Sequence, residues 1–348
     1  MRALMLAVFL AAPALAMRPI TPPAPDFPAG AAWVNAKPLT LGMMKDRKVV
    51  LVVFLNPTAL HSIRVLPVLK AWFDRYVLRQ LVVIGVVTPD LDVQRDAVWV
   101  RAQLKRLGVD FPVILDGDRK LWKAYGNEGW PALYLLDRKG NIVFDRLGEG
   151  QYGEFEGEIR DALYDLTTDP LPPAVEAPEP KTKDCGRATP DVDMGARAKT
   201  RMLALDQDYA KRRLLLVDSR QGELATRGRW DTEPDGLRLA QANEDQGAFV
   251  RVVYAATQVM AVLAPAAGKK TKFFVKVDDQ WLYEGPAGKD VRFDDDGRSY
   301  VQADGERLYD LVHDNGDKPH ELYVIPEGKG GGIYGFTFAD ACTATQLP

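Results

Sequence analysis

The segment that most constrains the fold runs from Lys48 to Trp72 and reads KVVLVVFLNPTALHSIRVLPVLKAW. Its first part, Val49 to Leu55, is an unbroken apolar and β-branched run, which predicts a strand buried on both faces. Asn56-Pro57-Thr58 ends this strand, and Thr58 is a candidate N-cap for a following helix. That helix contains Pro67, which removes one backbone hydrogen bond, and its apolar positions recur at helical spacing, at Ile63, Leu66, Leu69 and Phe73.

These residues resemble the redox corner of the thioredoxin-like domain in the DipZ/TlpA group of extracytoplasmic thiol–disulfide proteins. In that group the strand is followed by Cys-x-x-Cys, and a proline lies five residues after the second cysteine. Counting back from Pro67 gives a motif that reads Ala59-Leu60-His61-Ser62, so both sulfur positions, Ala59 and Ser62, lack a thiol. The resemblance also implies an acid in the preceding strand, where this chain has Val53. It therefore implies a thioredoxin fold that has lost its redox motif.

The N-terminus predicts export. Residues 1–16 read as a secretory signal peptide, with Arg2 as the positive residue, an apolar core, and a cleavage site at Ala14-Leu15-Ala16. Residues 17–32 then form a Pro-rich extension. No later stretch approaches the ~20 apolar residues that a membrane helix requires. We therefore expect a periplasmic or secreted protein that does not span the membrane after the signal is removed.

Composition limits the classes of function. A chain of 348 residues has room for two domains, and a hydrophobic fraction of 47% supports real cores. The formal net charge of -3 gives no electrostatic argument for nucleic acid as a partner. The histidines and the two cysteines are scattered along the chain, so the sequence predicts no metal site and no cofactor.

Residues 33–166 alternate between strand and helix patterns, which predicts an α/β thioredoxin-like domain. The expected elements are an edge strand at 39–41, strands at 81–87, 111–115 and 141–146, and helices at 93–107 and 155–166. The segment from Gly129 to Asp137 resembles the family's cis-proline loop with its following strand. This resemblance implies that the Trp130–Pro131 bond is cis and that the loop faces the former redox motif.

Residues 167–184 are rich in proline and charge, which predicts an extended, mobile linker. Residues 185–348 show short apolar runs separated by turn dipeptides, which predicts an all-β sandwich of the jelly-roll kind. This part also resembles the carbohydrate-binding-module-like C-terminal domain of DipZ-type proteins. The matching pieces are residues 228–230, 254–265, 307–312 and 334–338.

Leu60, His61, Trp130 and Pro131 are the candidate groove residues for an extended peptide. The alternative is that this surface is an unused remnant of the scaffold. His61 could act as a base or contact a peptide, but a loop histidine without a task is the commoner case. Ser62 is a weak candidate nucleophile, because its base would be the adjacent His61, and the side chains of adjacent residues rarely point at one another.

Aromatic residues in the second domain suggest a glycan-stacking platform. Trp281 and Tyr283 flank a turn-like segment and are the candidate glycan contacts. Buried core positions are the commoner use of aromatic side chains, and we expect them for Trp230 and Tyr334. Asp294-Asp295-Asp296-Gly297 reads as a solvated hairpin turn rather than a calcium site.

Cys185 and Cys342, the two cysteines of the chain, are predicted to form a disulfide. Export places them where oxidation is favoured, and they open and close the second domain. In a sandwich the first and last strands often lie side by side, within the reach of a disulfide.

The function predicted from sequence is that of an exported, redox-inactive member of the DipZ-like group. It would act as a binding or scaffolding module at the cell envelope, with an envelope protein, a peptide or a glycan as partner. One alternative is a thiol–disulfide oxidoreductase or redoxin of unplaced chemistry, although the active-site thiolate is missing. Another is a glycan-binding module that acts through the β-sandwich alone.

Overall fold

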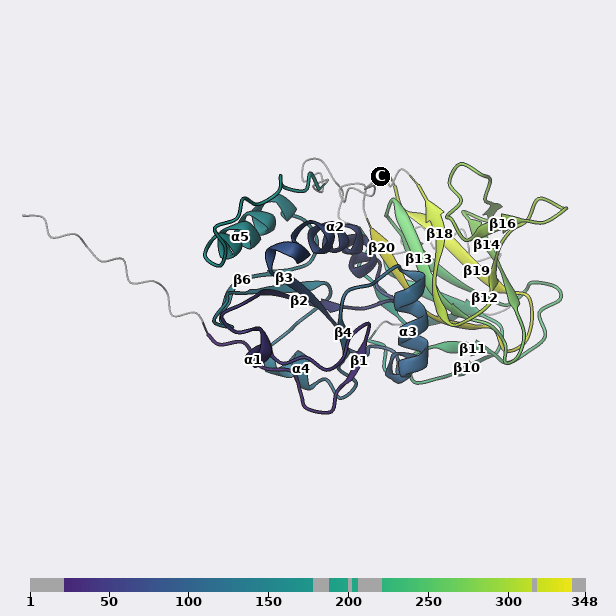
Figure 1. Cartoon of the computed structure of the whole chain (residues 1–348). Coiled ribbons are helices and arrows are strands. Elements are labelled where there is room, and N and C mark those ends of the chain that lie inside the picture. The colour runs from purple at the N-terminus through teal and green to yellow at the C-terminus, as the bar shows by residue number, and fades with distance from the viewer. Residues whose placement is uncertain (1–21, 178–187, 200–201, 206–220, 315–317, 340–348) are drawn as a thin grey trace, which may run out of the picture.

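The computed structural model describes residues 22–177, 188–199, 202–205, 221–314 and 318–339. An α/β domain and an all-β domain lie side by side (Figure 1). The predicted signal peptide at residues 1–16, residues 178–184 of the predicted linker, and both cysteines of the predicted disulfide lie outside the described residues.

The first domain is built on one six-stranded sheet with the strand order β1-β4-β3-β2-β5-β6. The central strand β2 pairs in parallel with β3 and antiparallel with β5. The strands are β1 Ala32–Val34, β2 Val49–Leu55, β3 Leu81–Val87, β4 Val113–Leu115, β5 Ala132–Leu136 and β6 Ile142–Leu147. This is the α/β thioredoxin-like architecture that the sequence predicts.

Helices cover both faces of this sheet. They are α1 Leu41–Met44, α2 Leu60–Tyr76, α3 Ala97–Arg106, α4 Lys120–Ala124 and α5 Tyr152–Tyr164, with 3-10 turns η1 Val77–Arg79 and η2 Asp92–Arg95. Alternate side chains of a strand point to opposite faces, so β2 contributes to two cores. Val49, Leu51, Val53 and Leu55 pack toward α2 and α5, while Val50, Val52 and Phe54 pack on the opposite face. All seven residues of β2 are buried, as the sequence predicts.

Three local predictions were wrong. The edge strand is β1, while residues 41–44 form α1, because the Thr40 side chain accepts the Met43 N–H and starts a helix there. Ala59 occupies the N-cap of α2, since the Thr58 hydroxyl is used instead by Asn56 and Gln94. The helix expected at 93–107 is split, because Asp96 is extended between η2 and α3.

The chain on either side of the predicted first domain packs against it. Ala24 N–H donates to the Gly140 carbonyl, and Phe27 is buried. Val175 N–H donates to Glu156 at 2.7 Å. The described residues of the predicted linker, 167–177, are therefore partly held on the domain, and are not the freely mobile segment that their composition predicts.

The second domain is a sandwich of two sheets, with the orders β10-β11-β20-β13-β18 and β16-β17-β14-β19-β12-β9-β8. Strand β7 pairs with β20, and β15 pairs with β14. Its strands are β7 Val192–Asp193, β8 Met202–Leu205, β9 Leu224–Arg227, β10 Trp230–Thr232, β11 Leu237–Leu239, β12 Phe249–Tyr254, β13 Gln258–Ala264, β14 Thr271–Val277, β15 Gln280–Trp281, β16 Val291–Phe293, β17 Ser299–Ala303, β18 Arg307–His313, β19 His320–Pro326 and β20 Gly332–Ala339. The predicted β-sandwich is therefore present, while its jelly-roll topology stays a prediction.

Among the described residues, no helix has both the length and the apolar character that crossing a membrane would demand.

Candidate functional site

The candidate site is the corner where β2 ends and α2 begins. Ala59 is extended and Leu60 is the first helical residue, so residues 59–62, the positions compared above with Cys-x-x-Cys, lie at the start of the helix. Ser62 is only 2% exposed, and its hydroxyl accepts the Asn56 N–H at 3.0 Å. Ser62 therefore holds the loop that precedes the helix, and its oxygen is not presented to a substrate.

A buried polar network fixes this loop to the next one. The Asn56 side-chain oxygen accepts hydrogen bonds from the Thr58 N–H, the Thr58 hydroxyl and the Gln94 amide, at 2.8–2.9 Å. Gln94 also donates to the Thr58 hydroxyl at 2.7 Å, and its oxygen accepts the Asp90 N–H. These side chains are almost fully buried. Their hydrogen bonds to one another therefore hold the corner in one conformation.

His61 is half-buried and is paired with a glutamate. Its Nδ1 lies 2.6 Å from Glu149 Oε1, and Arg64 Nε lies 3.5 Å from the other carboxylate oxygen. Burial lowers the pKa of His61, but the hydrogen bond and charge of Glu149, together with the charge of Asp191, outweigh it, so the pKa is raised. His61 is thus part of an ionic cluster and lies in helix α2 rather than in a loop. Its contact with a peptide stays a prediction.

The cis-proline loop approaches His61 through an intervening turn. The Trp130–Pro131 bond is cis, as the resemblance implies. The Pro131 carbonyl accepts the Gly148 N–H at 2.7 Å, and the neighbouring Glu149 binds His61. Trp130 packs against Trp122, with ring centroids 4.4 Å apart. The structure therefore connects His61 to the Trp130–Pro131 loop through residues 148–149.

Leu60 is separated from the other candidate groove residues. It is 1% exposed and lies in an apolar cluster with residues of the second domain, among them Val262 and Tyr334. An external peptide cannot reach this side chain while the domains are docked. The expectation that Leu60 lines an open groove is corrected, because the β-sandwich covers it.

Val53, at the position of the family's acid, is fully buried in the centre of β2. It packs among apolar side chains between the sheet and the α2–α5 layer. A carboxylate there would need a proton or a partner to offset its desolvation. The surroundings of Val53 are those of an ordinary core position.

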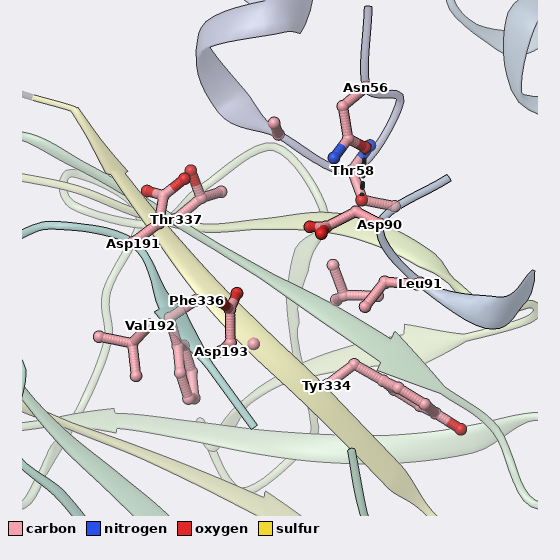
Figure 2. A pocket seen from close by; sticks show the side chains of 13 residues that line it. Asn56, Thr58, Asp90, Leu91, Asp191, Val192, Asp193, Tyr334, Phe336 and Thr337 are labelled. Carbon is pink, nitrogen blue, oxygen red and sulfur yellow. Dashed lines mark hydrogen bonds between the residues drawn. The ribbon is translucent and has the colours of Figure 1, made fainter. Parts of the chain in front are cut away.

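A narrow cleft opens between the two domains beside the corner (Figure 2). Asn56, Thr58 and Asp90 line it from the first domain, and Asp191, Asp193, Tyr334 and Thr337 line it from the second. Its volume is about 50 Å³, whereas small-molecule sites usually measure roughly 300–1,000 Å³. A few waters fit this space, but a drug-sized ligand does not.

The carboxyl groups of the cleft interact with one another. Desolvation of its carboxyl group in the cleft, and then the charge of Asp193, raise the pKa of Asp90 to about 6, while Arg119 opposes this shift. Desolvation also raises the pKa of Asp191, against a hydrogen bond from Thr337. Both residues are exposed overall. The described residues contain no group of three acidic, histidine or cysteine side chains that could hold a metal ion.

The predicted glycan contacts differ in exposure. Tyr283 is 72% exposed, whereas Trp281 is half-buried, 6.0 Å from the Phe274 ring and beneath the Lys276 ammonium. Tyr334 is buried, as expected, and its hydroxyl donates to Glu233. Trp230 is partly buried and packs against the sandwich core. No described contact joins Trp281 and Tyr283 to the corner of the first domain.

The acidic run at 294–297 forms a turn. The Gly297 N–H donates to the Asp294 carbonyl, and the Asp294 carboxylate pairs with Arg298 at 2.8 Å. The arrangement is the solvated hairpin that the sequence predicts.

Sequence reasoning missed Glu149, Gln94 and Asp191. Glu149 lies between two glycines with positive φ, Gly148 and Gly150, which marks a turn but does not reveal what the turn approaches. Gln94 sits in the segment predicted to be helical, with no sign of its buried role. Only the pairing of remote segments identifies these residues.

Comparison with known proteins gives two family matches in sequence order. Residues 21–163 match the model described as Redoxin, and residues 197–339 match the model described as Thioredoxin like C-terminal domain. The chain is a DipZ/TlpA-like thioredoxin-fold protein. The two matched segments correspond to the two domains of the structure.

DipZ of Mycobacterium tuberculosis is 32% identical over 172 residues, which is 49% of this chain and 23% of DipZ. The thiol-disulfide oxidoreductase ResA of Bacillus anthracis is 29% identical over 76 residues, which is 22% of this chain and 44% of ResA. The match with DipZ thus spans about a quarter of that protein. Among solved structures, a thioredoxin family thiol:disulfide interchange protein from Chlorobium tepidum is 21% identical, with a TM-score of 0.32, and covers 41% of this chain and 97% of its own.

Proposed function

We propose that this DipZ-like protein is exported and acts as a binding or scaffolding module at the cell envelope, without thiol–disulfide exchange. Exchange in this fold requires a reactive thiolate at the start of the helix after the central strand. The chain has alanine and serine at the two corresponding positions, and its cysteines are residues 185 and 342.

The main support for the proposal is the buried position of Ser62. Its hydroxyl is buried and accepts a backbone hydrogen bond from Asn56. Together with the Asn56–Thr58–Gln94 network, it makes the corner a fixed structural unit. A catalytic corner would instead present its reactive atom to a substrate.

Insulin reduction in the presence of dithiothreitol tests this proposal. We expect the turnover of the purified chain to equal that of buffer, with a thioredoxin as the positive control. Turnover above buffer that is lost in His61→Ala or Ser62→Ala would overturn the proposal.

The binding role has its own test. Crosslinking of the exported full chain in cells would identify envelope proteins or peptides held near His61 and Trp130. A partner that is lost on Trp130→Ala but retained on Tyr283→Ala would support binding through the cis-proline side of the corner. An unchanged crosslinking pattern in Trp130→Ala would exclude that surface.

A thiol–disulfide oxidoreductase is the alternative that the printed name of ResA suggests. It would have to use Cys185 and Cys342, which lie outside the described residues. Insulin reduction that is lost on Cys185→Ser, with no effect of Ser62→Ala, would favour this alternative.

Glycan binding by the β-sandwich is a further candidate, and the 72% exposure of Tyr283 is the observation that favours it. An exposed aromatic ring can stack on a sugar face while keeping its hydroxyl hydrated. Glycan-array binding by the full chain that is lost on Tyr283→Ala would support this function. Binding unaffected by changes at both Trp281 and Tyr283 would exclude these residues as the contact site.

A further inference from the structure

Strand β13 is apolar on both of its faces. Val259, Ala261 and Leu263 point into the core between the two sheets of the sandwich. The alternate residues Met260, Val262 and Ala264 are also buried, but they belong to a different cluster. An outer strand face in a two-sheet sandwich normally meets water, so a second apolar face needs a separate cover.

The first domain provides that cover. Leu60, at the start of α2, is buried in the same cluster as the outer face of β13, and Ile63 and Leu91 pack at its edge. The Leu60 N–H points to the Thr337 hydroxyl of β20 at 3.4 Å. Figure 1 shows α2 beside β20. The sandwich thus docks directly on the former redox corner.

Polar contacts surround this apolar centre. The Trp99 indole N–H of α3 donates to the Glu306 carbonyl at 2.7 Å. The Asp92 N–H donates to Asp235 at 2.6 Å. The Arg197 guanidinium binds both carboxylate oxygens of Asp92, at 2.7 and 3.0 Å. An apolar centre with a polar rim is the usual anatomy of a specific protein interface.

We propose that the β-sandwich is an autoinhibitory cover, which occupies the start of α2 as an intramolecular ligand. The sandwich supplies Val262, Tyr334 and Thr337 to the contact, and the first domain supplies Leu60. A peptide that uses this corner must first displace the sandwich, whereas the sandwich does not cover the side with His61 and Trp130, which are both partly exposed. This regulatory consequence rests on the proposed binding function, but the docking itself does not.

The geometry favours this chain's own sandwich over an external occupant. The cleft that remains between the domains, about 50 Å³, is too small for a peptide strand. The buried Leu60 side chain and the rim bonds close the contact on more than one side. The first domain of the same chain covers the outer face of β13, so no other chain is needed to shield it from water.

A thiol probe at the corner tests the cover. Ala59→Cys places a thiol in the wall of the cleft, and its labelling is measured on the proteolytic peptide that contains residue 59, so the native cysteines do not interfere. N-ethylmaleimide reports the intrinsic reactivity of the thiol, and a polyethylene-glycol maleimide reports its accessibility to a large molecule. We expect the bulky reagent to react at least tenfold more slowly than the small one.

Val262→Asp, added to the probe, should break the apolar centre and raise the rate of the bulky reagent at least tenfold, with little change for N-ethylmaleimide. Val143→Asp is the matched control, because Val143 is a strand residue of the first domain that is 37% exposed. It should leave both rates unchanged. Circular dichroism checks that each variant is folded.

Equal rates of the bulky reagent in the parent, Val262→Asp and Val143→Asp would overturn the proposal. If Val262→Asp does not fold, Arg197→Ala decides, since it removes the exposed ion pair with Asp92 across the rim and a longer pair with Asp235 of its own domain. It should speed the bulky reagent by roughly 1.4- to 5-fold, the range for such pairs. An unchanged rate in a folded Arg197→Ala would then overturn the cover. These readouts require neither a partner nor redox activity, so they stand apart from the proposed function.

Discussion

Replacing Gln94 with alanine should destabilise the first domain by about 2–3 kcal/mol. The Gln94 amide donates to Asn56 at 2.8 Å and to Thr58 at 2.7 Å, and its oxygen accepts the Asp90 N–H at 2.6 Å and the Leu91 N–H at 3.3 Å. At about 1 kcal/mol each, four bonds give roughly 4 kcal/mol. The side-chain entropy regained by removing glutamine returns about 1.5 kcal/mol.

The loss should fall at the upper end of this range because the partners stay buried. Asn56 is 2% exposed and Thr58 is 7% exposed, so water cannot easily replace the amide. Gln103→Ala is the matched control. Gln103 is also buried, at 8%, but its side chain accepts one bond, from Arg106 at 3.0 Å. We expect the control to lose less than about 1 kcal/mol.

Urea unfolding followed by tryptophan fluorescence measures the difference, provided that the slopes show a two-state transition for this domain. Hydrogen exchange at the Thr58 amide, which donates to Asn56, reports the corner directly and should accelerate in Gln94→Ala alone. If Gln94→Ala and Gln103→Ala lose the same stability within about 0.5 kcal/mol, the idea that this network fixes the corner is refuted.

Three further predictions follow from the site and the sequence. Because the pKa of Asp90 is raised to about 6, the folded state holds the proton more tightly, so the contribution of Asp90 to stability should fall from about pH 4 to about pH 6. Asp90→Asn should remove this contribution, and equal pH profiles of the parent and the variant would contradict the assignment. Restoring cysteine at residues 59 and 62 should give at most weak insulin reduction, because Val53 supplies no proton-handling acid; turnover like that of an active thioredoxin would refute this. Non-reducing peptide mapping should find Cys185 linked to Cys342, and two free thiols would refute the disulfide.

Local patterns predicted most of the secondary structure. The apolar run of β2 and the strand–helix alternation around it were found at or near the expected positions. Periodicity reports which face of an element is buried, and these elements have one clear periodicity each. Predictions failed where the hydrogen bond of a threonine side chain decided the local structure. Thr40 accepts the Met43 N–H and starts a helix, whereas Thr58 bonds to Asn56 and does not cap one.

The site was predicted only in part. The positions of Ala59, His61, Ser62 and the Trp130–Pro131 bond followed from their spacing and resemblance, and the structure links His61 to the Trp130–Pro131 loop through residues 148–149. The residues that contact them could not be predicted from the sequence. Glu149 lies 88 residues from His61 in sequence, and Thr337 lies 277 residues from Leu60. No local pattern encodes which of many carboxylates or hydroxyls will meet a given residue.

The presence of an α/β domain and a β-sandwich, and the absence of a thiol at the start of α2, could be read from the amino-acid sequence. Those properties depend on residue identity and short-range periodicity. Which residues surround the start of α2 is known only from the packing of the two domains. The apolar run of β13 predicts a strand. What covers its second face depends on how the two domains dock. Docking brings Leu60 against β13 and β20, and complementarity of that kind exists only once both domains have formed.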